Sequence, residues 1–553
     1  MNGLMMEQPL LISSLLKHAE RHHGEQWIVS RRVEGDIHRQ TYKDFAARSR
    51  RLANALAALG VEQSETVGTL AWNGYRHMEL YYAVSGYGAV VHTLNPRLHP
   101  DQLAWIVNHA QDRVLFFDLT FLPLVEAVAA SLPLIRHFVL MTDAAHMPQE
   151  SKIPGLLCYE TLLEQASERY EWPVFDEQRA SSLCYTSGTT GHPKGVLYSH
   201  RSTLLHTMAG ALPDALNLSA RDTVLPVVPM FHVNAWGLPY AVCMVGAKVV
   251  FPGPALDGKS LHELLESERV TFSGGVPTVW QGLLAYMDAN GLGFSTMRRT
   301  VIGGSACPPA MLRAFSERYD VQVLHGWGMT EMSPLGTICV LKPQHADLPL
   351  EERLGVLAKQ GRSLFGVDMK IIGPDGEDLP WDGLTSGELL VRGYWVLRQY
   401  AGDGGDPLVQ SNSEGWFPTG DVATICPLGF MQITDRAKDV IKSGGEWIGS
   451  IDLENIAMAH PAVAMAACIG ACHEKWDERP LLVVVKKPGA ALSRDELISF
   501  FEGKIAKWWT PDDVVFVESI PLGATGKMQK NKLREQFRNR FQSSNSKPNP
   551  EEN

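Results

Sequence analysis

The residues with the clearest chemical purpose lie between Tyr185 and Gly195. This segment contains three glycines, four serine or threonine hydroxyls and a single lysine, Lys194. Glycines let backbone N–H groups approach an anion, hydroxyls donate further hydrogen bonds, and a lysine supplies positive charge. The segment therefore predicts a phosphate-binding loop, and a plain hairpin is the alternative interpretation.

The sequence does not match the common nucleotide-binding loops or the nucleophile elbow of hydrolases. A Walker A lysine precedes Ser or Thr and opens a helix, whereas Lys194 precedes Gly195 and a strand-like run at residues 196–198. Residues 86–88 read Gly-Tyr-Gly and lack the third glycine of a dinucleotide-binding fingerprint. A Gly-x-Ser-x-Gly nucleophile elbow is also missing from the sequence.

Six further segments combine glycine or charged residues in short motifs. They are residues 303–306, 325–331, 419–421, 435–439, 442–446 and 523–527. In this order, and after the 185–195 loop, they resemble the signature motifs of the adenylate-forming superfamily of acyl-CoA synthetases, luciferases and peptide-synthetase adenylation domains. The resemblance implies an α/β fold with a large multi-subdomain N-terminal domain and a small mobile α+β C-terminal domain, and it implies ATP, Mg²⁺ and coenzyme A as ligands.

The resemblance also implies roles for residues at matching positions. Those expected around the nucleotide are Thr186, Ser187, Gly188, Thr189, Thr190, Gly191, Lys194, Gly303, Gly304, Ser305, Ala306, His325, Gly326, Trp327, Gly328, Met329, Thr330, Asp421, Ile433, Arg436, Ser443, Gly444, Gly445 and Glu446. Thr330 is expected on the α-phosphate, and Glu331 with Thr186 on Mg²⁺, which prefers oxygen ligands. Asp421 is expected to accept hydrogen bonds from the ribose hydroxyls.

Three lysines carry the catalytic cycle that the resemblance implies. Lys527 is expected between the attacking carboxylate and the α-phosphate, where an ammonium offsets the repulsion of two anions. Lys438 matches the hinge about which the small domain turns. In the second pose, the segment that begins at Lys442 is expected to form the coenzyme A tunnel and to support thioester formation.

The segment 229–237, Pro-Met-Phe-His-Val-Asn-Ala-Trp-Gly, indicates which kind of acid is the substrate. It resembles the corresponding segment of bacterial medium- and long-chain fatty acyl-CoA synthetases. The resemblance implies that His232 lies by the reaction centre, that Trp236 gates the chain tunnel, and that Val233 and Val276 line the acyl pocket. Residues 231–236 offer no carboxylate for a substrate ammonium, so a neutral, apolar acid is favoured, and a medium-chain fatty acid is the first choice.

Other functions stay open from the sequence. Methylthio-alkanoate and short branched-chain acyl-CoA ligases belong to the same branch, so 3-methylthiopropionate is an alternative substrate. A luciferase-like oxygenase would share the adenylation half of the reaction. The alternative outside the enzymes is a nucleotide-binding scaffold that keeps the fold without catalysing a reaction.

The elements that must position these residues follow an α/β pattern. Thr41 with Asp44 resembles a helix cap, apolar residues then recur at helical spacing up to Gly60, and a strand-like run follows at residues 66–70. The same alternation recurs at residues 248–251, 261–265 and 270–272. We expect an N-terminal domain at residues 1–435, a mobile domain at 436–542 and a disordered tail at 543–553.

Composition limits the partners and the compartment. A net charge of −11 argues against general nucleic-acid binding, which needs a basic face. The apolar run at residues 9–16 is too short to span a bilayer, and eight cysteines without a Cys-x-x-Cys pair predict reduced thiols. We expect a cytoplasmic enzyme that forms a homodimer. Peripheral contact with a membrane is left open.

Overall fold

The structure is a computed structural model that describes residues 1, 3–186, 193–402, 415–443, 446–523 and 528–541. The chain forms two compact units, the first made of Met1–Met369 and Val391–Pro418 and the second of Lys370–Leu390 and Thr419–Asn553. The domain boundary expected at residues 435–436 falls inside the second unit and remains a prediction. The tail at 543–553 lies outside the described residues.

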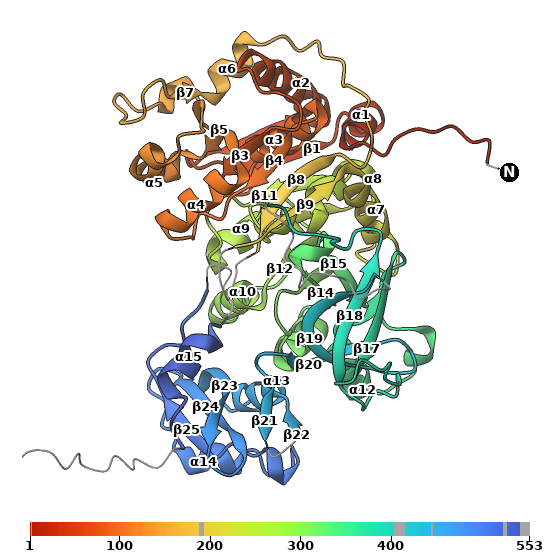
Figure 1. Ribbon diagram of the computed structural model, residues 1–553, viewed down its shortest axis with the longest axis vertical. Coiled ribbons are helices and arrows are strands. Elements are labelled where there is room, and N and C mark those ends of the chain that lie inside the picture. The colour runs from red at the N-terminus through yellow and green to blue at the C-terminus, as the bar shows by residue number, and fades with distance from the viewer. Residues whose placement is uncertain (2, 187–192, 403–414, 444–445, 524–527, 542–553) are drawn as a thin grey trace, which may run out of the picture. The chain divides into compact units, whose positions relative to one another are not determined.

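A nine-stranded sheet of the first unit has the order β16-β15-β14-β13-β12-β10-β11-β1-β2. Its strands are β1 (Trp27–Arg31), β2 (Ile37–Thr41), β10 (Thr223–Pro226), β11 (Lys248–Phe251), β12 (Phe272–Gly275), β13 (Arg299–Ile302), β14 (Gln322–Gly328), β15 (Leu335–Cys339) and β16 (Arg362–Ser363). Of these strands, Figure 1 labels β15, β14, β12, β11 and β1. The run from β14 to β1 is parallel throughout. The loops that follow these strands therefore meet at one edge of the sheet.

A seven-stranded sheet of the same unit has the order β7-β6-β5-β3-β4-β8-β9. Its strands are β3 (Thr66–Leu70), β4 (Val90–Thr93), β5 (Asp112–Phe117), β6 (His137–Leu140), β7 (Leu157–Cys158), β8 (Ala180–Tyr185) and β9 (Gly195–Ser199). Only the β8–β9 pair in this sheet is antiparallel. The glycine-rich segment therefore joins two antiparallel strands and leads into a strand, which confirms that it is no Walker A loop.

Twelve helices accompany these sheets in the described part of the first unit. They are α1 (Ile12–His23), α2 (Tyr42–Ala58), α3 (Tyr75–Tyr87), α4 (Pro100–Ala110), α5 (Leu122–Val128), α6 (Tyr159–Gln165), α7 (His200–Ala211), α8 (Leu238–Val245), α9 (Gly258–Ser267), α10 (Pro277–Asn290), α11 (Pro309–Arg313) and α12 (Leu350–Leu357). The predicted cap of α2 is confirmed, because Thr41 and Asp44 form a capping box. Among the described helices, none has the length and apolar character needed to cross a bilayer.

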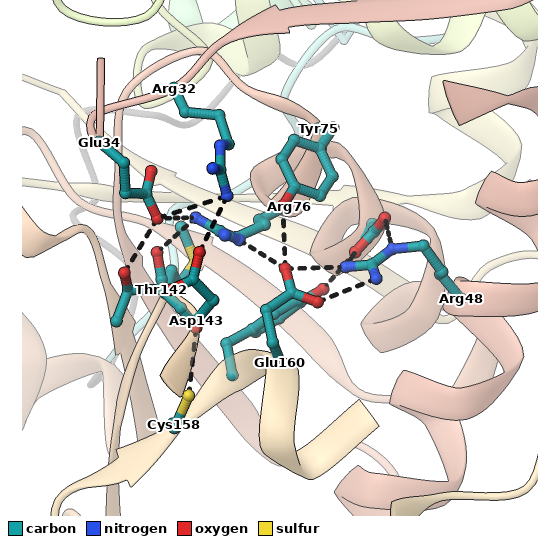
Figure 2. A network of polar contacts seen from close by, with 12 residues as sticks. Arg32, Glu34, Arg48, Tyr75, Arg76, Thr142, Asp143, Cys158 and Glu160 are labelled. Carbon is teal, nitrogen blue, oxygen red and sulfur yellow. Dashed lines mark hydrogen bonds and ion pairs between the residues drawn. The ribbon is translucent and has the colours of Figure 1, made fainter. Parts of the chain in front are cut away.

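A network of charged side chains connects residues of α2, α3 and α6 with residues that follow β1 (Figure 2). Arg76 on α3 contacts Glu34, which follows β1, at 2.7 Å and Glu160 on α6 at 2.8 Å. Arg48 on α2 also contacts Glu160, at 2.9 Å. Burial alone would raise the pKa of the Glu160 carboxyl, but the two guanidinium groups outweigh it and hold the pKa at about 2. The network ties three helices to the end of β1.

A four-stranded sheet has the order β17-β18-β19-β20. Its strands are β17 (Val367–Ile372), β18 (Gly387–Gly393), β19 (Phe417–Ile425) and β20 (Met431–Arg436). The points at which the chain changes from one unit to the other lie within β17, β18 and β19. The rest of the second unit holds β21 (Ile441–Ser443), β22 (Glu446–Ile448), β23 (Val463–His473), β24 (Asp477–Lys486) and β25 (Asp513–Phe516), with α13 (Ser450–Met458), α14 (Arg494–Ser499) and α15 (Lys530–Phe537).

The β23–β24 hairpin is buried on both faces because successive side chains point to opposite sides. Cys468 and Leu482 belong to one apolar cluster with residues of α13 and α14, and Ile469 belongs to another with Leu533 of α15. Figure 1 shows these helices around the strands. The α/β class with a small α+β unit at the C-terminal end of the sequence is thus confirmed.

Candidate functional site

Four neighbouring parallel strands carry the predicted site segments of the first unit at their carboxyl ends. They are β10, β12, β13 and β14, and they are adjacent in the sheet. β10 leads to His232, β12 to Val276, β13 to Gly303 and β14 to Thr330. Segments that lie up to about a hundred residues apart are therefore brought to one edge of one sheet, as expected for a ligand site in an open α/β sheet.

The loop after β13 runs tightly against its neighbours. A Cβ atom at Gly303 would lie 2.9 Å from the carbonyl oxygen of Gly326 and 3.3 Å from the Trp236 ring. Gly304 has a φ of +82°, a value that favours glycine. Both glycines are therefore required by the backbone path, which leaves Ser305 exposed and Ala306 partly exposed at the strand ends.

The His325 side chain connects this loop to the Ala358 carbonyl through hydrogen bonds of its two ring nitrogens. Its Nδ1 lies 2.9 Å from the Ala358 carbonyl, and its Nε2 accepts the Cys307 N–H at 3.3 Å. Burial lowers the pKa of the His325 imidazole to about 4, so the neutral ring that this pattern needs is present at neutral pH. The side chain thus positions the 303–307 loop, and the adjoining Trp327 is also buried.

Thr330 and Glu331 are held in place by two tyrosines. Each of the two residues is only 8% exposed. The Tyr198 hydroxyl donates to the Thr330 carbonyl at 2.6 Å, and the Tyr400 hydroxyl donates to Glu331 Oε1 at 2.6 Å. The carboxylate predicted to bind Mg²⁺ therefore has a fixed orientation.

The two ends of the glycine-rich loop close on each other. The Thr186 N–H donates to the Lys194 carbonyl at 2.9 Å, and the Lys194 N–H lies 3.4 Å from Thr186 Oγ1. The Lys194 ammonium lies 5.0 Å from the centre of the Tyr400 ring. The structure thus brings Lys194 and Glu331 to the same tyrosine. Ser187, Gly188, Thr189, Thr190 and Gly191 lie outside the described residues.

The predicted acyl segment contains a left-handed turn. Residues 233–237 all have positive φ, from +46° at Val233 to +78° at Gly237. A left-handed conformation costs roughly 1–2 kcal/mol for each non-glycine residue, so surrounding contacts must hold it. The buried Asn234 does so, because its amide donates to Ser182 Oγ at 2.9 Å.

This turn leaves His232 and Trp236 partly exposed, while the other residues of 231–240 are buried. The Trp236 ring lies against Gly303, where a Cβ atom would crowd it at 3.3 Å, and within van der Waals distance of Gly274. Val276 lies against Gly304 in the same way. Trp236 and Val276, two of the residues predicted to form the acyl pocket and its gate, therefore border the 303–306 loop.

In the second unit, Asp421 and Arg436 form an ion pair across β19 and β20. Arg436 Nε lies 2.8 Å from Asp421 Oδ1, and the Asp421 side chain is 2% exposed. Ile433 lies on β20 and pairs with Ala423. Asp421, which is predicted to bind the ribose, is thus adjacent to Arg436, another residue expected around the nucleotide.

The predicted hinge and coenzyme A segments lie further along the second unit. The Lys438 carbonyl accepts a hydrogen bond from Arg534 at 3.1 Å. Lys442 is exposed on β21, and its N–H donates to Glu478 at 3.0 Å. The Ser443 hydroxyl accepts from Arg479 at 3.1 Å, and the backbone of Glu446 opens β22. Gly444, Gly445 and Lys527 lie outside the described residues, so the place of Lys527 stays a prediction.

The residues that sequence reasoning missed are the supports: Tyr198, Tyr400 and Asn234. Their partners are 132, 69 and 52 residues away along the chain. The sequence offers no local signal for such pairs, because a lone tyrosine or asparagine has no periodic or spacing pattern.

The Glu331 carboxylate and the Thr186 hydroxyl, the two predicted metal ligands, supply the oxygen donors that suit Mg²⁺. Among the described residues, no group of three or more His, Cys, Asp or Glu side chains could hold a metal. Mg²⁺ often uses only one or two protein carboxylates and completes its shell with phosphate oxygens and water. The residues present therefore fit Mg²⁺ bound together with nucleotide phosphates.

The fold and these segments define an adenylate-forming α/β enzyme, and comparisons with known proteins give the same result. A family model described as AMP-binding enzyme matches residues 15–401, and one described as AMP-binding enzyme C-terminal domain matches residues 452–527. The chain belongs to the AMP-binding enzyme family, and within it to the AMP-forming acyl-CoA ligases.

Two curated relatives match along nearly the whole chain. The 3-methylmercaptopropionyl-CoA ligase of Ruegeria lacuscaerulensis is 56% identical over 97% of this chain and 99% of its own. The medium-chain fatty acid–CoA ligase of Ectopseudomonas oleovorans is 53% identical over 97% of this chain and 98% of its own. A solved structure of an anthranilate CoA ligase with anthranoyl-AMP has a TM-score of 0.84 at 25% identity, covering 96% of this chain and 98% of that one.

Proposed function

We propose that this ligase activates a medium-chain fatty acid in two steps. The acid's carboxylate oxygen attacks the α-phosphorus of ATP, the bond to pyrophosphate breaks, and an acyl-adenylate forms. The coenzyme A thiolate then attacks the acyl carbon, the carbon–oxygen bond to AMP breaks, and the thioester is released. The observation that carries this proposal is the meeting of Glu331 and Lys194 at Tyr400, beside the strand ends that bear the acyl segment.

In the first step, the chain would supply positive charge and fixed hydrogen-bond donors. The 186–194 loop and Lys194 would bind the phosphates, and Thr330 the α-phosphate. Mg²⁺, held by Glu331 with Thr186, would neutralise charge on the phosphates. Asp421 would bind the ribose hydroxyls, and Arg436 would bind the ribose or a phosphate. Lys527 would sit between the two reacting anions, where it is stabilising only as they approach.

In the second step, we propose that the small domain turns about Lys438. The turn would withdraw Lys527 and bring the 442–446 segment to the adenylate, where it would line the path of the coenzyme A thiol. A hinged exchange of two loops lets one site carry out two reactions.

The substrate assignment rests on the neutral lining of the pocket segments. His232, Val233, Trp236 and Val276 include no carboxylate, which suits an apolar tail. Since a 3-methylmercaptopropionyl-CoA ligase is similar over the same length, 3-methylthiopropionate is the second candidate. We also propose that the enzyme is cytoplasmic, because the eight cysteines are free thiols that suit a reducing compartment. A homodimer is proposed from the resemblance to fatty acyl-CoA synthetases alone. Light scattering would measure the subunit number.

The test is AMP release with a panel of acids from two carbons to sixteen, with and without a thioether. The proposal expects kcat/KM to rise with chain length as each further buried CH₂ contributes about 0.8 kcal/mol, and to be highest for medium-chain acids. A preference for 3-methylthiopropionate would favour the second candidate. Oxygen uptake or light would favour an oxygenase, and a protein that binds ATP but turns over no acid would be a scaffold.

A further inference from the structure

Residues 395–401, here called the strap, connect two parts of the candidate site in the first unit through three hydrogen bonds. The Trp395 indole donates to the Leu335 carbonyl at 3.0 Å, just after the Glu331 loop. The Leu397 N–H donates to the Glu331 carbonyl at 2.7 Å, and the Ala401 N–H donates to the Gly195 carbonyl at 2.8 Å. One short segment thus holds the backbone of the carboxylate loop and of the phosphate loop.

Tyr400 contacts both of these loops, one through its hydroxyl and the other through its aromatic ring. Its hydroxyl donates to Glu331 Oε1 at 2.6 Å, a short hydrogen bond of the charge-assisted kind. Its ring lies 5.0 Å from the Lys194 ammonium, within the range of a cation–π contact. The ring also packs on the apolar cluster of Cys184, Val196 and Tyr198, so it cannot swing away without losing those contacts.

These contacts matter because a carboxylate that binds a metal must present its oxygens in a fixed direction. Groups that hydrogen-bond to a metal-binding side chain orient it, and their loss commonly weakens metal binding by about 10- to 100-fold. The Lys194 contact fixes the second charge that a triphosphate would meet. If Tyr400 served only to pack on the apolar cluster, its ring would be sufficient and its hydroxyl would not be needed.

We propose that Tyr400 is a positioning residue, which fixes the Glu331 carboxylate and the Lys194 ammonium relative to each other so that they meet a metal-bound triphosphate together. The inference rests on the proposed function, since it takes Mg²⁺ and ATP as the ligands. In this proposal, the hydroxyl orients Glu331, the predicted metal ligand, and the ring orients Lys194, the predicted phosphate ligand.

The test is calorimetric binding of a non-hydrolysable ATP analogue, with Mg²⁺ and with EDTA. Tyr400→Phe keeps the ring and should weaken binding by about 10-fold or more with Mg²⁺ and by less than about 3-fold without it. Tyr400→Leu should weaken binding in EDTA as well, by about 2- to 5-fold, because the cation–π contact is lost. Tyr394→Phe, an exposed tyrosine near the same strap, is the matched control and should change neither value.

A double-mutant cycle separates positioning from a general effect on folding. In a Glu331→Gln background, Tyr400→Phe should have little further effect on the Mg²⁺ dependence, because its partner is already neutral. An equal loss with and without Mg²⁺, or an undiminished loss in the Glu331→Gln background, would overturn the inference. Wild-type protein that fails to bind the analogue at all would instead contradict the proposed function.

Discussion

Arg436 and Asp421 face each other across β19 and β20, with Arg436 Nε 2.8 Å from the Asp421 carboxylate. The guanidinium of Arg436 holds an almost fully buried carboxylate in one orientation. An ionised acceptor in a fixed position is suited to a pair of donor hydroxyls, such as those of a ribose.

Asp421→Asn should therefore weaken the use of ATP more than the use of 2′-deoxy-ATP. A hydrogen bond to a charged group contributes about 1.5–3 kcal/mol, so kcat/KM for ATP should fall by roughly 10- to 100-fold. The preference for ATP over 2′-deoxy-ATP should shrink at the same time. Initial rates of AMP release with the two nucleotides measure both, and an unchanged preference would remove Asp421 from the ribose.

The network around Glu160 makes stability depend on pH in a defined direction. The folded pKa of Glu160, about 2, lies below its ordinary value of 4.5, so this contribution is present above pH 4.5 and is lost as the pH falls toward 2. Glu160→Gln leaves Arg48 and Arg76 short of a carboxylate and should reduce the unfolding free energy by about 2–4 kcal/mol at pH 7.

Denaturant unfolding of both proteins at pH 7 and pH 3 measures this effect. The difference between wild type and variant should be smaller at pH 3. Glu25→Gln, which removes an exposed partner of Lys43, is the control and should cost less than about 1 kcal/mol. A variant as stable as wild type at pH 7 would show that the network does not contribute.

The left-handed turn predicts a specific role for Asn234. Asn234→Ala removes the amide that binds Ser182 and leaves a residue that tolerates positive φ poorly, so a loss of about 1–3 kcal/mol is expected. The acid preference should change with it, because the turn positions His232 and Trp236. Asn217→Ala tests the backbone effect alone, since Asn217 also has a positive φ but is exposed. Thermal unfolding and the acid panel are the measurements, and equal effects of the two variants would refute this role.

Elements with strong local signals could be predicted from the sequence. The capping box of α2, the strands β3 and β11 and the strand after Lys194 all follow from caps, glycines and short apolar runs. A strand expected from Val270 begins instead at Phe272, because the parallel pairing of β12 with β10 and β13 sets where it starts.

Features that depend on distant contacts could not be predicted. Residues 233–237 look like an ordinary loop in the sequence, and the left-handed turn depends on tertiary partners such as Ser182. The role of Tyr400 likewise requires that the strap lie beside both Lys194 and Glu331. Nucleotide-binding motifs were readable because their residue types are dictated by the ligand, whereas their supports are dictated by packing.

The two-step account is tested most directly by a pair of variants, Lys527→Ala and Lys442→Ala. Each is assayed for carboxylate-dependent pyrophosphate exchange and for thioester formation from supplied acyl-adenylate. The account predicts that Lys527→Ala loses exchange by about 100-fold or more but still forms thioester, and that Lys442→Ala shows the reverse. A Lys527→Ala enzyme with normal pyrophosphate exchange would contradict it.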